Sequence, residues 1–217
     1  INASGFSALN AEVRYLNPVL HVTFPRDTNG VKWANRFTSV NKKREGVLTT
    51  TKIHPDSPVD PKKKANEEYT SEIDWTKVLF AAGPLLIPSV TVSKANLSRE
   101  QIIAEKTRLR SLFASLANAE TPAVAAEEGE MYSITFTQES AVYEGAYCWA
   151  DDRIYGVIYS PEDHFALVQQ LRDRGENGVT TIVVPSFVKP ENIHVYSLAI
   201  TADGKITSNS VHMTLGA

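Results

Sequence analysis

Residues 192–215 read NIHVYSLAITADGKITSNSVHMTL. This stretch holds two runs in which apolar and polar residues alternate, and Asp203 and Gly204 lie between them. Asp-Gly between two such runs is a strong hairpin signal, because glycine adopts the positive φ that a tight turn needs. In the first run, Val195 and every second residue after it fall on one face of a strand, and Tyr196 and every second residue after it on the other. The stretch therefore predicts a C-terminal β-hairpin with Asp203 and Gly204 at its tip.

Short runs of strand-like composition continue upstream of this hairpin, as far as Met131. They cover residues 133–137, 143–149, 154–159 and 179–184, whereas residues 165–171 fit either a helix or a strand. Several short strands with turn signals between them are typical of a sandwich, and the alternation of strands and helices that marks a parallel sheet is missing. The sequence therefore predicts a mainly β protein with helical elements and an antiparallel immunoglobulin/fibronectin-like β-sandwich in its C-terminal half.

The N-terminal residues carry an apolar stripe. Residues 4–17 repeat apolar side chains at steps of three and four, which predicts a helix that Ser4 caps and Pro18 ends. Residues 19–24 alternate and predict a strand, and residues 31–40 predict a second short helix. The stripe and the strand contain seven large apolar residues, Phe6, Leu9, Val13, Leu16, Leu20, Val22 and Phe24. Such a surface will not stay in water, so it either folds back on its own chain or forms an assembly arm that packs on a neighbouring copy.

The next part of the chain is predicted to be less regular. Residues 41–70 combine basic clusters with prolines, which break helices and strands, and they predict a long surface loop. The alternative is a polyanion-binding arm, which the acidic neighbours Glu67 and Glu68 disfavour. Residues 73–80 and 85–92 predict two strands. Pro88 makes the second of these an edge strand or a bulged one, because proline has no N–H to donate to a neighbour.

A helix is predicted over residues 98–118. Ser98 and Gln101 fit a capping box, in which the hydroxyl and the amide each satisfy a free backbone N–H at the start of the helix. The small and acidic residues 119–130 predict a linker. We accordingly divide the chain into three parts, 1–72, 73–130 and 131–217.

Composition limits the classes of function. The formal net charge of −3 argues against a nucleic-acid binder, which normally has a strong basic excess. No apolar run is long enough to predict a membrane span. Cys148 is the only cysteine, so no disulfide within the chain is expected. The chain starts at Ile1 rather than at a methionine, from which we expect a processed N-terminus.

The residues that carry chemistry do not form a recognisable catalytic set. No two histidines have the i, i+4 spacing of a zinc pair, and His194 and His212 on the two arms of the hairpin are expected to pack as cross-strand neighbours. Asp151 and Asp152 are expected in a turn, since adjacent residues of a strand point to opposite faces. Cys148 is expected to be a small buried residue rather than a nucleophile. We therefore predict no catalytic residue, no cofactor and no metal.

Several motifs together resemble an uncharacterised Bacteroidetes family, domain of unknown function 6266. Five segments resemble the C-terminal part of that family. They are AYCW at 146–149, DRIYGVIYSP at 152–161, TIVVP at 181–185, HVY at 194–196 and ADGKITSNS at 202–210. IDWTKVLFAAGPL at 73–85 resembles the middle segment of the family. Residues 6–24, with LNP at 16–18, resemble its helical start. The glycine-rich leader of the family is missing, and the helix from Ser98 looks like an insertion. The family has no established activity, so the resemblance bears on the fold rather than on the function.

The tyrosines and tryptophans of the C-terminal half are the remaining candidates for a binding surface. Most are expected in the core, although exposed rings on a sheet can stack on sugars or anchor a partner. We predict a non-enzymatic structural subunit of a self-assembling extracellular or cell-surface filament or appendage, whose partners are copies of itself. The alternatives are a virion structural protein, such as a phage tail or capsid accessory protein, and a carbohydrate-binding module.

Overall fold

The computed structural model describes residues 2–24, 32–58, 60, 63, 65–116 and 131–215. The elements, in chain order, are α1 (Asn2–Thr23), α2 (Trp33–Lys43), β1 (Leu48–Lys52), α3 (Ala65–Glu68), β2 (Tyr69–Ile73), the short 3-10 helix η1 (Trp75–Lys77), β3 (Ser89–Asn96), α4 (Arg99–Leu116), β4 (Tyr132–Glu139), β5 (Arg153–Ser160), β6 (Phe165–Asp173), β7 (Gly178–Val184), η2 (Pro190–Asn192), β8 (His194–Ile200) and β9 (Val211–Met213). The protein is mainly β with helical elements, as the sequence predicts.

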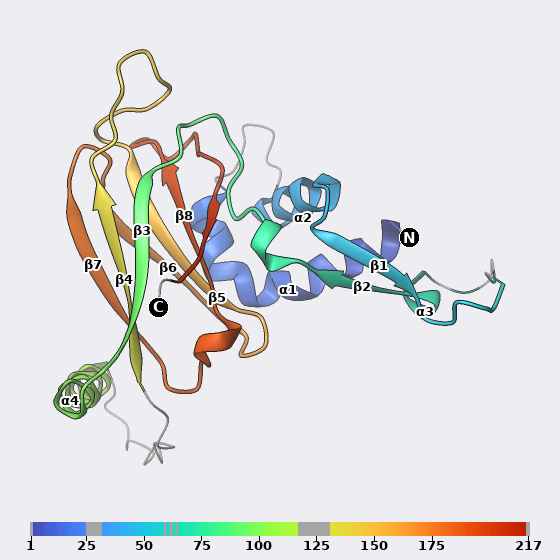
Figure 1. The fold of residues 1–217 in the computed structure, drawn as a ribbon, viewed down its shortest axis with the longest axis horizontal. Coiled ribbons are helices and arrows are strands. Elements are labelled where there is room, and N and C mark those ends of the chain that lie inside the picture. Colours follow the sequence, from blue (N-terminus) through green and yellow to red (C-terminus); the bar gives the residue numbers. More distant parts are fainter. Residues whose placement is uncertain are drawn as a thin grey trace.

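The strands of the described residues form antiparallel sheets (Figure 1). One sheet has the strand order β3-β4-β7, and a second has the order β6-β5-β8-β9. A separate pair, β1 and β2, lies on the far side of α1 and α2 from the two larger sheets. Every pairing between these strands is antiparallel. β3 lies in the part 73–130 of the sequence and pairs with β4 from the part 131–217, so one sheet joins both parts.

The two larger sheets bury a hydrophobic cluster between them. Ile134 and Phe136 of β4 lie in one cluster with Ile158 of β5 and Val195 of β8. The approach is close at Gly156, where an added Cβ atom would lie 2.7 Å from the ring of Phe136. A glycine in β5 therefore lets the strand lie directly under this ring.

The helices cover the other face of the four-stranded sheet. Alternate residues of β5 and β8 point away from the three-stranded sheet. Two of them, Val157 and Leu198, lie in a second cluster with Leu16 and Leu20 of α1. β8 is consequently buried on both faces, and all its residues after His194 are buried. This is why its sequence is apolar at nearly every position rather than at every second one.

The predicted C-terminal hairpin is confirmed. Gly204 has a φ of +75°, and its N–H donates to the carbonyl of Thr201 over 2.8 Å. β8 and β9 are antiparallel, with Val195 opposite Met213. Residues 201–210 make a longer excursion than a simple tight hairpin, because the regular pairing of β9 begins only at Val211.

The prediction that a helix ends at Pro18 and a strand follows was wrong. α1 continues to Thr23 with Pro18 inside it. Proline removes one backbone hydrogen bond and disfavours the helix, but burial outweighs this cost. Leu16, Val19 and Leu20 all have an exposed fraction of 0%, and they stay on one face only if the helix continues.

The seven residues of the predicted assembly arm lie, in this structure, mainly against their own chain. Four of them, Leu9, Leu16, Leu20 and Phe24, have exposed fractions of 0–1%. Val13 and Val22 pack against the same cluster while partly exposed, whereas Phe6 is 43% exposed. The fold-back arrangement is thus the one that the single chain adopts.

The prediction of one long loop over 41–70 was also wrong in part. α2 extends to Lys43, and β1 and β2 pair with each other on the flank of α1. The Ser4 hydroxyl of α1 lies 2.8 Å from the hydroxyl of Ser71 in β2, which in turn lies 2.9 Å from that of Thr50. These strands are rich in threonine and charge, so the apolar pattern that marks a strand is too weak to show in the sequence.

Three further expectations concern single segments. Residues 73–80 hold the end of β2 and η1 rather than one strand, and residues 143–149 form a loop, with Gly145 at a φ of +77°. Residues 165–171, which fitted a helix or a strand, belong to β6. The strand predicted over 85–92 is shifted to β3, which begins directly after Pro88, and of the two predicted alternatives, an edge strand or a bulged one, β3 is the edge strand.

The helix predicted over 98–118 is α4, and its capping box is confirmed. The Ser98 N–H donates to the Gln101 side-chain oxygen over 2.8 Å, and the Gln101 N–H donates to the Ser98 hydroxyl over 3.3 Å. α4 stands at the far end of the three-stranded sheet (Figure 1), with Ile103 57% exposed. The linker predicted over 119–130 lies outside the described residues. No helix among the described residues is long and apolar enough to span a membrane.

Truncation of the α1 stripe should destabilise the isolated chain. Leu16→Ala removes a fully buried side chain and leaves a cavity, so we expect the free energy of unfolding to fall by about 2–5 kcal/mol in urea titrations. Phe6→Ala on the same helix is the control, with an expected loss below about 1 kcal/mol because Phe6 is largely exposed. Equal losses for both variants would contradict the packing described for α1.

Candidate binding site

Several connecting segments meet at one end of the two larger sheets. Arg153 at the start of β5 pairs with Asp173 at the end of β6 and with Ile200 at the end of β8. Ser89 at the start of β3 pairs with Glu139 at the end of β4. The segments that adjoin these positions, 81–88, 140–152, 174–177 and 201–210, are therefore neighbours. The one between β4 and β5 stands out furthest (Figure 1).

Residues 140–152, which we name the aromatic loop, expose large side chains to solvent. Tyr143 is 59% exposed, Tyr147 48% and Trp149 46%, and Val142 beside them is 45% exposed. The rings of Tyr147 and Trp149 meet edge to face, with centroids 5.0 Å apart. Sequence reasoning noted the tyrosines but expected most aromatic rings of this half in the core. That expectation holds for Tyr159 and Tyr196, which are buried, and fails for this loop.

The aromatic loop is fixed by its own hydrogen bonds. The Ala146 N–H donates to the Tyr143 carbonyl over 3.2 Å, and the Leu86 N–H donates to the Tyr147 carbonyl over 3.0 Å. Cys148, which lies between Tyr147 and Trp149 in the sequence, is buried, and its sulfur accepts from the Tyr143 N–H over 3.5 Å. Cys148 is thus a small buried residue, as predicted. A loop held in this way loses little entropy when it binds a partner.

A buried ion pair anchors the base of the aromatic loop. The Arg174 Nε donates to the Asp152 Oδ2 over 2.9 Å, and each side chain is 1% exposed. The Trp149 N–H also donates to the Asp152 Oδ2, over 3.0 Å. The Arg174 Nη2 donates to the Leu86 carbonyl over 2.6 Å. One charge pair therefore joins the aromatic loop, the β6–β7 turn and the segment before β3.

Sequence reasoning did not find this pair. It placed Asp151 and Asp152 in a turn, which is where they lie, but it gave Asp152 no partner and did not single out Arg174. The two residues are 22 positions apart and no spacing rule connects them. A single Arg or Asp at a strand end is ordinarily a solvated residue, so only the fold reveals that these two are buried.

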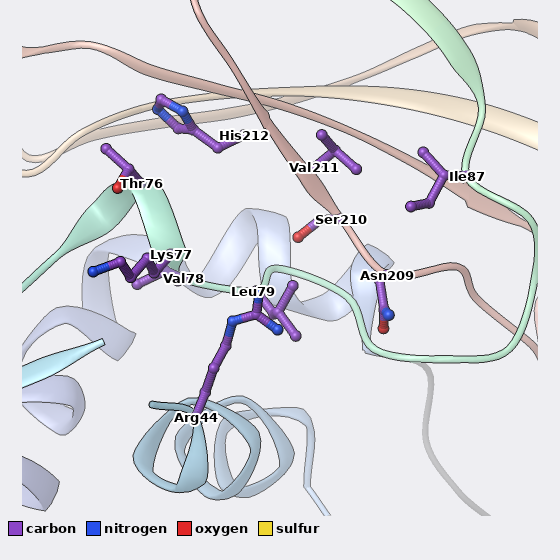
Figure 2. Close-up of a pocket in the computed structure, with 10 residues that line it drawn as sticks. All are labelled: Arg44, Thr76, Lys77, Val78, Leu79, Ile87, Asn209, Ser210, Val211 and His212. Atoms are coloured by element: carbon purple, nitrogen blue, oxygen red, sulfur yellow. The ribbon is translucent and has the colours of Figure 1, made fainter. Parts of the chain in front are cut away.

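Figure 2 shows the residues that line an open pocket of about 370 Å³. We name it the Arg44 pocket, and its lining includes Arg44, Lys77, Leu79, Ile87, Asn209 and Val211. Figure 2 shows the Arg44 side chain extending from the end of α2 toward Leu79, with Asn209 across from it. Ile87 directly follows Leu86, whose N–H and carbonyl hold Tyr147 and Arg174, so the pocket and the aromatic loop share one segment.

The Arg44 pocket has a positive character. Lys77 is paired with Asp74 over 3.0 Å, and the hydrogen bonds from Thr76 and Lys77 lower the pKa of the Asp74 carboxyl. The guanidinium of Arg44, in contrast, has no hydrogen-bond or ion-pair partner within the described part of the chain. An unpaired guanidinium above apolar side chains is suited to a carboxylate carried on an apolar group.

His194 and His212 lie close together at the edge of this pocket, across β8 and β9. The His194 Nδ1 and the His212 Nε2 are 3.3 Å apart. Burial lowers the pKa of His194 to about 4, with a further contribution from His212, and burial also lowers the pKa of His212. No group of three or more His, Cys, Asp or Glu that could hold a metal occurs among the described residues. The two rings thus pack as the predicted cross-strand neighbours.

Comparison of the chain with protein-family models, with curated proteins and with solved structures gives no match. The resemblance to domain of unknown function 6266 stays a prediction from the motifs quoted above.

Removal of Arg174 should destabilise the protein strongly. Arg174→Met leaves the Asp152 carboxylate buried without its counter-charge, so we expect a loss of about 3–5 kcal/mol in the free energy of unfolding. Arg172→Met, two residues away and exposed, should change it by less than about 0.5 kcal/mol. Adding Asp152→Asn to Arg174→Met should recover part of the loss, because the uncompensated charge is then gone. A double variant with a lower free energy of unfolding than Arg174→Met alone would contradict this account.

Stability should rise with pH between about 4 and 6.5. The unfolded chain protonates His194 near its ordinary pKa of 6.5, whereas the folded chain does so only near 4, so the unfolded state binds more protons within this window. His194→Gln should flatten the dependence of the free energy of unfolding on pH in this window, measured by urea titration at each pH. His54→Gln, on an exposed stretch, should leave the slope unchanged. An unaltered slope in His194→Gln would show that other groups govern this range.

Proposed function

We propose that this protein is a non-enzymatic structural subunit that assembles with copies of itself through the aromatic loop. A filament or an appendage is the larger assembly that such a subunit would build. The single observation that carries the proposal is the set of exposed rings on residues 140–152, which a buried ion pair and several hydrogen bonds hold in place. Exposed apolar surface costs solubility, so a rigid cluster of it marks a contact surface.

The fold is proposed to be a fibronectin-like β-sandwich. If β3 to β9 are named A, B, C, C′, E, F and G in chain order, one sheet has the order A-B-E and the other C′-C-F-G. This distribution, together with the apolar cluster between the sheets, supports membership of the immunoglobulin and fibronectin architectures. In such sandwiches the loops at one end are the usual place for binding residues, and the aromatic loop then corresponds to the loop between B and C.

The non-catalytic part of the proposal rests on the state of the reactive groups. Cys148 is buried, and the His194 and His212 rings contact each other and aromatic neighbours rather than a nucleophile. Burial lowers the pKa of both histidines, that of His194 to about 4, and so favours their neutral forms. A general acid or base needs a pKa close to the working pH, which argues against that role for His194.

A carbohydrate-binding module is the second candidate. Tyr147 and Trp149 form an exposed corner of two aromatic rings, and the apolar face of a sugar stacks on such rings. The aromatic loop carries Glu144 and Asp151 and no Lys or Arg, so a neutral glycan is favoured over an acidic one. We rank this second because Val142 and Ile87 enlarge the apolar patch beyond the rings that a sugar would use.

Sedimentation velocity over a range of concentrations tests the proposal. We expect the protein to self-associate, and Trp149→Ala to weaken this association by at least about tenfold, as for a central aromatic contact. Phe187→Ala is the matched control, since Phe187 is 63% exposed and follows β7 at the opposite end of the sheets. Persistent monomers would contradict the proposal. Quenching of tryptophan fluorescence by neutral oligosaccharides in the wild type, but not in Trp149→Ala, would then support the carbohydrate-binding alternative.

A further inference from the structure

We infer that the aromatic loop of one copy inserts into the Arg44 pocket of a second copy, and that the second copy returns the same contact. This inference rests on the proposed function and names its interface. The contact is reciprocal, so it forms a closed dimer with two-fold symmetry, in which each copy contributes one loop and one pocket. A filament or an appendage would then grow from such dimers through a second, different contact.

The positions of the two surfaces favour a reciprocal contact. Ile87 lines the pocket, and Leu86 before it receives the Arg174 guanidinium and donates to the Tyr147 carbonyl. Loop and pocket are thus side by side rather than at opposite ends of the molecule. A two-fold axis places the same patch of both copies face to face. When one patch holds both the loop and the pocket, the loop of each copy faces the pocket of the other. A head-to-tail chain would instead need them on opposite sides.

The charges of the two surfaces are complementary. The aromatic loop carries Glu144 next to Tyr143 and no basic residue, and Glu144 is exposed. The pocket presents Arg44, whose guanidinium is unpaired within the described chain, whereas Lys77 beside it is already paired with Asp74. A carboxylate and a guanidinium form strong paired hydrogen bonds once water is excluded. We therefore pair Glu144 of one copy with Arg44 of the other.

The apolar parts of the two surfaces also match. The pocket has Val78, Leu79, Val211 and Ile87 among its lining residues, and Ile87 is 46% exposed. Its volume of about 370 Å³ is within the range of pockets that hold small organic molecules, and one aromatic side chain is of that size or smaller. An exposed ring from the aromatic loop would cover this surface, so that both exposed apolar patches leave the solvent together.

A charge exchange between two variants tests this pairing. Glu144→Arg and Arg44→Glu should each raise the dissociation constant of the dimer by at least tenfold in sedimentation velocity, because identical copies then bring like charges together. An equimolar mixture should recover dimers with close to the original affinity. In the mixed dimer, Arg at 144 meets Glu at 44, while the other contact keeps Glu144 and Arg44.

Controls separate this inference from the proposed function. Glu191→Arg and Lys189→Glu reverse exposed charges near η2, at the opposite end of the sheets, and should leave the dimer unchanged. Circular dichroism and thermal unfolding of every variant verify folding. If the wild type associates and Trp149→Ala weakens it while the mixture stays monomeric, the Arg44 pairing is wrong and self-assembly through the aromatic loop stands. If the wild type is monomeric throughout, both are wrong.

Discussion

The burial of both faces of the four-stranded sheet is the constraint on which the rest of the structure depends. β5 and β8 form the centre of this sheet, and their alternate residues contact two different partners. One set packs against the three-stranded sheet and the other against α1 and α2. An antiparallel sheet normally leaves one face to solvent, so the second covering layer must come from elsewhere in the chain. The N-terminal helix provides it, which explains why α1 continues through Pro18 despite the lost hydrogen bond.

The end of the sheets that carries the candidate site depends on a different kind of interaction. Asp152 and Arg174 pair in the interior, where a hydrophobic pair of similar size is often at least as stable. The Asp152 Oδ1 and the Arg174 Nη1 have no partner among the described residues, so the pair is not optimal for stability alone. Its hydrogen bonds to Trp149 and Leu86 indicate what it supplies, which is a fixed position for the base of the aromatic loop. A rigid loop with exposed rings is costly unless it binds something, and this reasoning supports an interaction subunit.

The aromatic loop and the Arg44 pocket are complementary in charge, but among the described residues none of this loop lines the pocket of its own chain. The aromatic loop is acidic and apolar, and the Arg44 pocket is basic and apolar, yet their shared segment places them side by side. The aromatic loop does not fold back into the adjacent pocket of its own chain. Its Tyr147 carbonyl is held by the Leu86 N–H, and its rings are exposed to solvent. In the proposed dimer, pairing between copies would bring the two together without a change of fold.

Three features could be predicted from the sequence, namely the turn at Asp203 and Gly204, the strand that precedes it and the α4 capping box. Each follows from a local rule, since turn conformation, strand alternation and helix capping involve neighbouring residues. The tertiary structure alone decided the course of α1 beyond Pro18, the pairing of the polar strands β1 and β2, and the Asp152–Arg174 pair. It also decided which aromatic rings are exposed, because Tyr147 and Tyr159 both lie in runs of strand-like composition and yet have opposite burial. These features depend on contacts between distant residues, for which a pattern of neighbouring side chains contains no information.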